Sequence, residues 1–167
     1  MVAKQPIRIR VGEGHDSHRT VSDRPLMLGG QQIDCDFGLD GHSDADVLLH
    51  AVIDSLLGAI AAGDIGDWFP NTEAKWENAS SAKMAKHVVK SVRKKGWEIG
   101  NLDCTIFAEK PRLTDWKPRI RERLADVLGI DEQCVNVKAK SGEKVGPVGR
   151  CEAIAASSVV LLFSRTD

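Results

Sequence analysis

Two short segments of the chain concentrate side chains that could bind a metal ion or move a proton. The first, GEGHDSHR at residues 12–19, carries His15, Asp16 and His18 where a strand-like stretch ends. Because side chains along a strand alternate between two faces, Asp16 and His18 point the same way and His15 points the opposite way. Two ligands on one face are not yet a metal site, and a polar strand end is the plainer interpretation.

The second segment, GHSDADVLLH at residues 41–50, opens a predicted helix over residues 44–62. Ser43 is suited to be its N-cap, and Asp46 three residues later gives a start like a capping box. The helix is apolar over most of its circumference, so it should be buried, with His50 two turns inside. A histidine in that position is more often a hydrogen-bonded core residue than a ligand.

A metal centre needs a third ligand, and His50 could supply it to Asp16 and His18. Three protein ligands leave the fourth tetrahedral position open, as in catalytic zinc sites. Asp46 and Asp54 flank His50 at four residues on either side, on one polar stripe of the helix. One of these two carboxylates could hold the second ring nitrogen of His50.

Features suited to phosphate occur at two other places. His42 and Ser43 stand at the N-terminus of the predicted helix, where free N–H groups and the helix dipole favour an anion. The segment KAKSGEKVGPVGR, residues 138–150, leaves a strand and enters a glycine-bearing loop whose Glu143 could hold Mg²⁺. The alternative for this loop is a flexible surface turn with solvated charges. Its candidate phosphate ligands are Lys140, Ser141, Lys144 and Arg150.

The elements that must position these groups alternate between strands and helices. Apolar alternation predicts a strand at 7–11 and two short strands around a Gly-Gly turn at 25–38, while 63–73 is typical of a loop. The later elements are predicted as a helix at 79–95, a strand at 102–109, a helix at 118–129, and strands at 134–140 and 153–163. This order indicates an α/β (α+β) class, a mixed β-sheet with helices packed on one face.

The final strand, AIAASSVVLLF, is apolar on both of its alternating faces. Helices can cover one face, and in a chain this short another subunit could cover the other. The basic residues of the helix at 79–95 could form a binding patch, but we interpret them as an ordinary solvated face.

Length and composition restrict the class of protein. The 167 residues fit a single domain, 1–167, and their hydrophobic (42%) and charged (28%) content is that of a globular protein. A formal net charge of −1 gives no support for a nucleic-acid or anionic-membrane partner. No apolar run has the length of a membrane span and the N-terminus lacks a signal-peptide core, so we expect a cytoplasmic location. Four widely spaced cysteines favour reduced thiols.

Five motifs in a fixed order resemble those of a known enzyme family. They are D-x-H at 16–18, H-S-D-x-D-V-x-x-H at 42–50, G-D-I-G-x-x-F-P at 63–70, A-x-x-P at 108–111, and V-K-A…E-K-x-G…G-R at 137–150. Their order and spacing, from about residue 7 to residue 164, are similar to those of the 2-C-methyl-D-erythritol 2,4-cyclodiphosphate synthase family. Five ordered motifs are far more specific than any one of them alone.

The resemblance implies a phosphorus–oxygen lyase of the non-mevalonate isoprenoid pathway. In this family the 2-phosphate of 4-diphosphocytidyl-2-C-methyl-D-erythritol 2-phosphate attacks the β-phosphorus, CMP leaves, and a cyclic diphosphate forms. The resemblance also implies zinc, or another divalent metal at the same site, together with Mg²⁺ or Mn²⁺. Family members are homotrimers with active sites between adjacent subunits, which agrees with a final strand that needs covering on both faces.

Matching by position transfers the family's functional residues to this chain. The implied zinc ligands are Asp16, His18 and His50, the magnesium ligand is Glu143, and the catalytic residues are His42, which stabilises the transition state, and Ser141. Residues 64–66 match a segment that contacts sugar hydroxyls, 69–73 a substrate loop, and 108–114 a segment that surrounds cytosine. The implied substrate-binding residues are Ser43, Asp64, Ile65, Gly66, Phe69, Pro70, Asn71, Thr72, Glu73, Ala108, Glu109, Lys110, Pro111, Arg112, Leu113, Thr114, Lys140, Ser141, Gly142, Pro147 and Arg150.

Three places depart from the family pattern. His15 stands where the family usually has an aromatic residue, directly before the first zinc ligand. Lys140 and Ser141 replace a frequent pair of threonines. Pro147 stands where many members carry an aromatic residue that lines a central cavity of the trimer, while Arg150 is retained.

Overall fold

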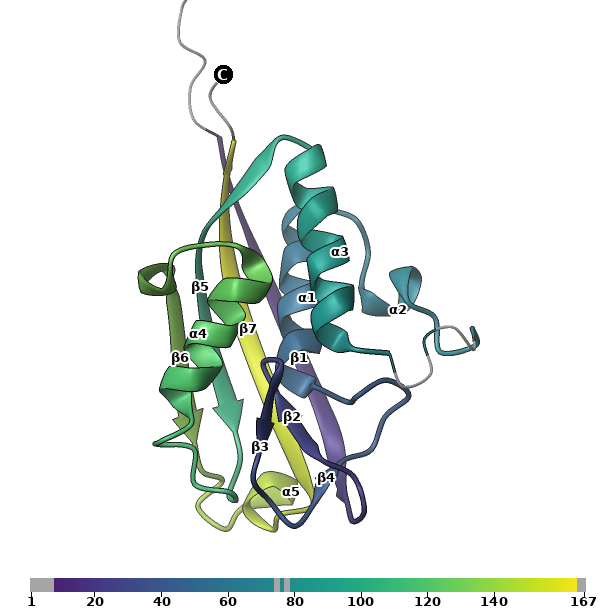
Figure 1. Ribbon diagram of the computed structural model, residues 1–167, viewed down its shortest axis with the longest axis vertical. Coiled ribbons are helices and arrows are strands. Elements are labelled where there is room, and N and C mark those ends of the chain that lie inside the picture. The colour runs from purple at the N-terminus through teal and green to yellow at the C-terminus, as the bar shows by residue number, and fades with distance from the viewer. Residues whose placement is uncertain (1–7, 74–75, 77–78, 165–167) are drawn as a thin grey trace, which may run out of the picture.

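The computed structural model describes residues 8–73, 76 and 79–164, and it shows a mixed sheet with helices on one face (Figure 1). Strands β5 and β6 are parallel and the other neighbouring strands are antiparallel. The α+β class expected from the sequence is therefore confirmed. The spatial order of the strands is β4 (Gly38–Leu39), β1 (Ile9–Val21), β7 (Ala153–Ser164), β5 (Trp97–Phe107) and β6 (Val135–Lys140).

Three long helices cover the sheet: α1 (Val47–Ala59), α3 (Ser81–Lys94) and α4 (Lys117–Leu128) (Figure 1). Helix α1 packs on β1 and β7 and is buried almost all round, as its apolar sequence predicted. Helix α3 exposes Lys83, Lys86 and Lys90, so its basic face is solvated in the chain. The shorter elements are β2 (Leu26–Leu28), β3 (Gln31–Ile33), α2 (Ile65–Trp68), the 3₁₀-helix η2 (Glu132–Cys134) and α5 (Gly146–Gly149).

Two glycines allow α1 to lie directly on β1. A Cβ atom at Gly12 would stand 1.9 Å from the carbonyl oxygen of Ser55, and one at Gly14 would stand 2.0 Å from that of Ala51. Any side chain at either position would therefore push the helix away from the strand. The inward face of β1 thus carries two glycines followed by Asp16 and His18, which brings these two side chains beside the first turn of α1.

Strand β1 extends ten residues beyond the predicted end at residue 11, because β7 pairs with it from Ile9 opposite Phe163 to Arg19 opposite Ala153. The strand-like alternation assumed for Asp16 and His18 is therefore correct. Residue 7 of the predicted strand, and residues 1–7 and 165–167 of the predicted single domain, lie outside the described residues.

Helix α1 begins later than predicted, at Val47 instead of residue 44. Its N-cap is Asp46, whose carboxylate accepts a hydrogen bond from the backbone N–H of Leu49 at 3.0 Å. The predicted Ser43 N-cap is wrong, since the preceding Ala45 has a φ of 54° and breaks the helical path. His50 consequently lies in the first turn, and the predicted position two turns inside is also wrong.

The predicted loop at 63–73 contains the short helix α2. Asp64 and Asp67 form a reciprocal capping box at its start, a pattern that the Asp and Gly content of the segment concealed.

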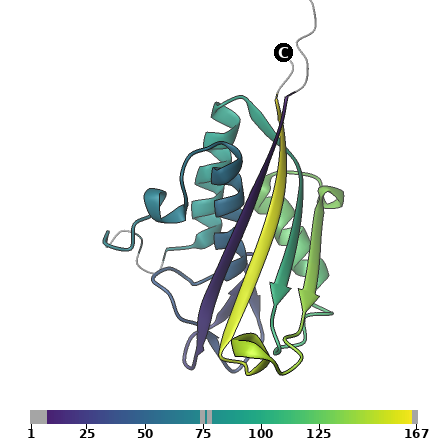
Figure 2. The ribbon, with the colours of Figure 1, turned by 180° about the vertical axis from the view of Figure 1, so that it is seen from behind.

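Seen from behind, the sheet has no helix over most of its second face (Figure 2). Several apolar side chains of β1 and β7 are exposed on that face. Neighbouring Ile9 and Phe163 are 63% and 37% exposed, and Val11 and Val159 are 61% and 44% exposed. Within the described part of the chain no helix covers these residues, so a covering subunit stays a prediction. None of the described helices is long and apolar enough to cross a membrane.

Candidate active site

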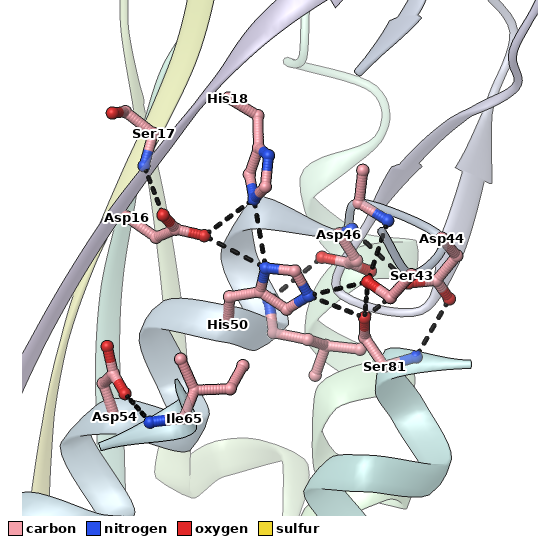
Figure 3. A network of polar contacts seen from close by, with 12 residues as sticks. Asp16, Ser17, His18, Ser43, Asp44, Asp46, His50, Asp54, Ile65 and Ser81 are labelled. Carbon is pink, nitrogen blue, oxygen red and sulfur yellow. Dashed lines mark hydrogen bonds and ion pairs between the residues drawn. The ribbon is translucent and has the colours of Figure 1, made fainter. Parts of the chain in front are cut away.

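Three side chains from two elements converge on one point beside β1 (Figure 3). The Oδ2 atom of Asp16 lies 2.9 Å from Nε2 of His18 and 3.0 Å from Nδ1 of His50. The two ring nitrogens are 3.1 Å apart, and the three donor atoms all lie within 4.8 Å of one another. Two imidazole nitrogens and one carboxylate oxygen form a donor set that suits a divalent metal ion.

The orientation of His18 follows from its outer contact. Its Nδ1 lies 2.5 Å from the backbone carbonyl oxygen of Asp40, which can only accept a hydrogen bond. The proton of a neutral His18 ring is therefore on Nδ1, and the lone pair of Nε2 faces Asp16 and His50. A backbone carbonyl in this role is a common partner of metal-binding histidines.

His50 is held by serines, and the predicted carboxylate partners are wrong. Its Nε2 lies 3.0 Å from the hydroxyl oxygen of Ser43 and 3.0 Å from that of Ser81. Asp46 instead accepts hydrogen bonds from the N–H groups of Gly29, Gly30 and Leu49, at 2.8, 2.6 and 3.0 Å. Asp54, one turn beyond His50 on α1, accepts a hydrogen bond from the N–H of Ile65 at 2.8 Å. Both acidic side chains therefore fix loops and helix ends.

The electrostatics of the triad favour a charged cluster. Burial opposes the ionisation of Asp16, but the imidazole rings of His18 and His50, whose nitrogens lie 2.9 and 3.0 Å from Oδ2, outweigh it and hold the pKa of Asp16 well below its usual range. Burial also lowers the pKa of His18, and the contact with Asp16 overcomes this and raises that pKa above its usual value. The carboxylate of Asp16 therefore stays ionised, and its charge favours the protonated form of His18.

A pocket of about 410 Å³ opens beside the triad. The site residues predicted from the sequence that line this pocket are Asp16, His18, His42, Ser43, His50, Ile65, Gly66, Phe69, Pro70 and Asn71. Three other predicted substrate residues, Asp64, Thr72 and Glu73, do not line it, and Asp64 caps α2.

The sequence interpretation missed Trp76 and Met84 in the pocket wall, and Ser81 behind His50. Met84 belongs to the apolar stripe of α3, and no periodic signal distinguishes it from core. Ser81 is the first residue of the same helix, and a serine there is ordinarily read only as a mark of the helix N-terminus.

A second pocket, of about 300 Å³, lies where β5 and β6 end. The predicted residues that line it are Ala108, Glu109, Pro111, Arg112, Leu113, Thr114, Lys140 and Ser141, and Lys117 and Ala139 join them. Lys110 does not line it. The side chain of Glu109 accepts a hydrogen bond from the N–H of Gly142 at 3.1 Å, which ties the two strand-end loops together.

The remaining predicted residues lie in the loop after β6. The hydroxyl of Ser141 donates to Oε1 of Glu143 at 2.7 Å, and both side chains are exposed. Arg150 forms an ion pair with Glu152 at 2.8 Å, which holds the pKa of the Glu152 carboxyl below its usual range. Neither Pro147 nor Arg150 lines either pocket.

Comparisons with known proteins agree on one family. The model of the YgbB family matches residues 9–163. A 2-C-methyl-D-erythritol 2,4-cyclodiphosphate synthase from Synechocystis sp. is 51% identical over 157 residues, 94% of this chain and 98% of that protein. The protein of the same name from Synechococcus elongatus is 50% identical over 155 residues, 93% of this chain and 97% of that protein.

Solved structures give the same result. IspF of Plasmodium falciparum in a CDP complex has a TM-score of 0.84 and 33% identity, covering 95% of this chain and 97% of that one. The bifunctional IspDF of Campylobacter jejuni has a TM-score of 0.94 and 40% identity, covering 98% of this chain. This chain spans 44% of that bifunctional protein.

Proposed function

Because the chain belongs to the YgbB family of 2-C-methyl-D-erythritol 2,4-cyclodiphosphate synthases and acts in isoprenoid biosynthesis, we propose the following reaction for it. The enzyme takes 4-diphosphocytidyl-2-C-methyl-D-erythritol 2-phosphate, joins its 2-phosphate to the β-phosphorus, and releases CMP and the 2,4-cyclodiphosphate. It is then a phosphorus–oxygen lyase. The observation that carries the proposal is the convergence of Asp16, His18 and His50 beside His42 and Ser43 in one pocket.

Asp16, His18 and His50 would hold zinc, and Glu143 would hold Mg²⁺ or Mn²⁺. Two nitrogens and one carboxylate oxygen support zinc at the triad, and an exposed carboxylate supports a hard cation at Glu143. When bound, these ions would supply positive charge that stabilises the phosphoryl oxygens of the transition state.

The side chains around the triad would orient the two phosphates. His42 and Ser43 line the pocket, and their imidazole and hydroxyl groups can donate hydrogen bonds to phosphate oxygens. No general base is required, since a phosphate monoester is already anionic near neutral pH. The protein's contribution is therefore positioning and charge neutralisation, as in phosphoryl transfer generally.

The second pocket would bind the cytidine end of the substrate. Three cationic side chains, Arg112, Lys117 and Lys140, line it and can balance phosphate charge, and the hydroxyl group of Ser141 lies beside them. The complex of the Plasmodium falciparum relative with CDP supports a nucleotide ligand. The enclosing contacts around cytosine would come from the segment 108–114.

Among the described residues the two pockets share no lining residue, which supports an active site completed by a neighbouring subunit. We assign the chain to a homotrimer, in which the apolar outer sheet face of Ile9, Val11, Val159 and Phe163 is covered. The ion pair of Arg150 and Glu152 and the loop at Pro147 would lie near the trimer's central cavity. The cytoplasmic location stays a prediction.

Product analysis tests the reaction. The protein loaded with zinc and supplied with Mg²⁺ should release CMP and the cyclic diphosphate from the diphosphocytidyl substrate. A zinc hydrolase would give CMP with a linear phosphate, and a non-catalytic nucleotide-binding module would release no CMP. Either of these results would end the synthase proposal.

A further inference from the structure

We propose that Asp44 and Ser81 position His50 by keeping a proton on its Nε2 atom, so that Nδ1 stays free to bind a metal ion. This inference deepens the proposed function, since it rests on the metal site of Asp16, His18 and His50. It assigns a role to two residues that lie outside the implied ligand and substrate sets. Both act through His50, so they are positioning residues.

Asp44 fixes the direction of the hydrogen bond that Ser81 makes. Its carboxylate oxygens can only accept, and they receive both donors of Ser81: the hydroxyl at Oδ1 and the backbone N–H at Oδ2, 3.0 Å away (Figure 3). Ser80, at the N-cap of α3, makes no side-chain capping bond, so Asp44 caps this helix from outside. The N–H of Asp44 donates to the carbonyl of Ala79 at 3.1 Å, which holds the two segments together.

Ser81 consequently has no proton left for His50. Its hydroxyl oxygen lies 3.0 Å from Nε2 of His50 and can only accept there, so Nε2 must carry a proton. Ser43 lies equally close, and its hydroxyl oxygen is 3.4 Å from that of Ser81. Among the described residues the Ser43 hydroxyl contacts no carboxylate, so it can turn either to donate or to accept. Ser81, with its proton committed to Asp44, therefore decides the protonation of Nε2.

The arrangement opposes a competing interaction on the other side of the ring. Oδ2 of Asp16 lies 3.0 Å from Nδ1 of His50 and would favour a proton on that atom. A proton there would occupy the nitrogen that must bind the metal ion. Because Ser81 is 0% exposed and His50 is 8% exposed, water cannot readily replace the hydrogen bond to Nε2. The Asp44–Ser81 pair thus holds the ring in the binding state.

The first test reads the proton directly, in metal-free protein with ¹⁵N-labelled histidine. At about pH 8, where an ordinary histidine is neutral, ring NMR should show the His50 proton on Nε2. In Ser81→Ala, Ser43 can donate to Nε2 and Asp16 can accept from Nδ1, so the proton should move to Nδ1. A wild-type proton on Nδ1 alone, or an unchanged ring in Ser81→Ala, would overturn the inference.

The second test measures zinc affinity by competition with a chelator. Ser81→Ala and Asp44→Asn should each bind zinc about 10- to 100-fold more weakly, the range for partners of metal-binding histidines. In Asp44→Asn, the side-chain amide has one acceptor oxygen for the two donors of Ser81. Asp54→Asn is the matched control, because it removes one negative charge from α1 at a side chain that has no hydrogen bond with His50. The zinc affinity of this variant should stay within about twofold of the wild-type value.

The two proposals fail in different ways. If wild-type protein binds no zinc but shows the Nε2 proton and its loss in Ser81→Ala, the positioning pair stands and the proposed metal site fails. If wild-type protein binds zinc and both variants bind it as tightly as wild type does, the metal site stands and the positioning pair is refuted.

Discussion

The two pockets of this chain are built in different ways. At the triad, the side chains of Asp16, His18 and His50 are 28%, 18% and 11% exposed, and each makes further polar contacts. At the second pocket, Arg112, Lys140 and Ser141 are exposed. One chain can therefore orient the three candidate metal ligands by its own packing. The second pocket has charge but little enclosure, which is what a surface completed by another subunit requires.

The largest expected effect concerns the triad. His50→Ala should lower zinc affinity by at least about 100-fold and abolish turnover, since two ligands cannot replace three. Zinc stoichiometry and CMP release measure these effects, and circular dichroism should show that the fold remains. His15→Ala is the control, because His15 lies on the opposite face of the same strand. Full zinc occupancy in His50→Ala would remove His50 from the site.

The next largest effect concerns the outer sheet face, where a substitution should disrupt the proposed trimer but leave the triad intact. Val159→Lys should break the trimer and reduce turnover by more than about tenfold while leaving zinc bound, because a lysine there places a charge in an apolar interface. Its neighbours in register, Glu13 and Asp103, can accommodate a lysine in a separate subunit. Sedimentation and zinc stoichiometry report both properties. Gln32→Lys, exposed on β3, should change neither, and a fully active trimer of Val159→Lys would contradict the proposed interface.

A smaller effect concerns the packing that creates the triad. Gly14→Ala should destabilise the fold by about 2 kcal/mol, because its Cβ would overlap the carbonyl of Ala51. Gly58→Ala on the same helix meets nothing nearer than 3.8 Å and should stabilise by up to about 1 kcal/mol. Urea unfolding measures both. Equal free energies of unfolding for the two variants would show that β1 and α1 are not in direct contact.

The smallest effect concerns Cys104, a buried residue of the core on the side of the second pocket. Cys104 on β5 is 1% exposed, and burial raises the pKa of its thiol to about 12. Only the thiolate reacts, so alkylation in the folded protein should continue to increase up to about pH 12, whereas the unfolded thiol levels off near its usual 9.0. Mass spectrometry of alkylated peptides follows this. Reaction of Cys104 near pH 8 at the rate of an unfolded control would show that this core is open.

The sequence predicted the fold class and the convergence of the triad because these depend on periodic patterns. Alternation placed Asp16 and His18 on one face, and an apolar helix had to pack on the sheet that carries them. The partners of His50 could not be predicted in this way. Ser81 comes from another helix, and Ala45 interrupts the helical path, so spacing along one helix wrongly favoured Asp46 and Asp54.

For the second pocket, the sequence pattern alone indicated only a composition suited to phosphate, in the loop after the strand at 134–140. Lysines, a serine and glycines after a strand occur both in phosphate-binding loops and in solvated surface turns, so this composition does not distinguish the two. Lys117 was missed because it lies at the start of α4, outside the motifs. Whether another subunit supplies an opposite wall is a property of an assembly, and no pattern within one chain specifies it.

A mixed trimer tests most directly the claim that the two pockets combine across subunits. His50→Ala and Glu143→Gln should each be inactive alone. When co-expressed with different tags and purified through both, trimers of mixed composition should regain about one third of wild-type turnover, because one interface in three joins two intact halves. If each active site lay within one chain, every site would carry a substitution, and the mixed trimers would show no turnover.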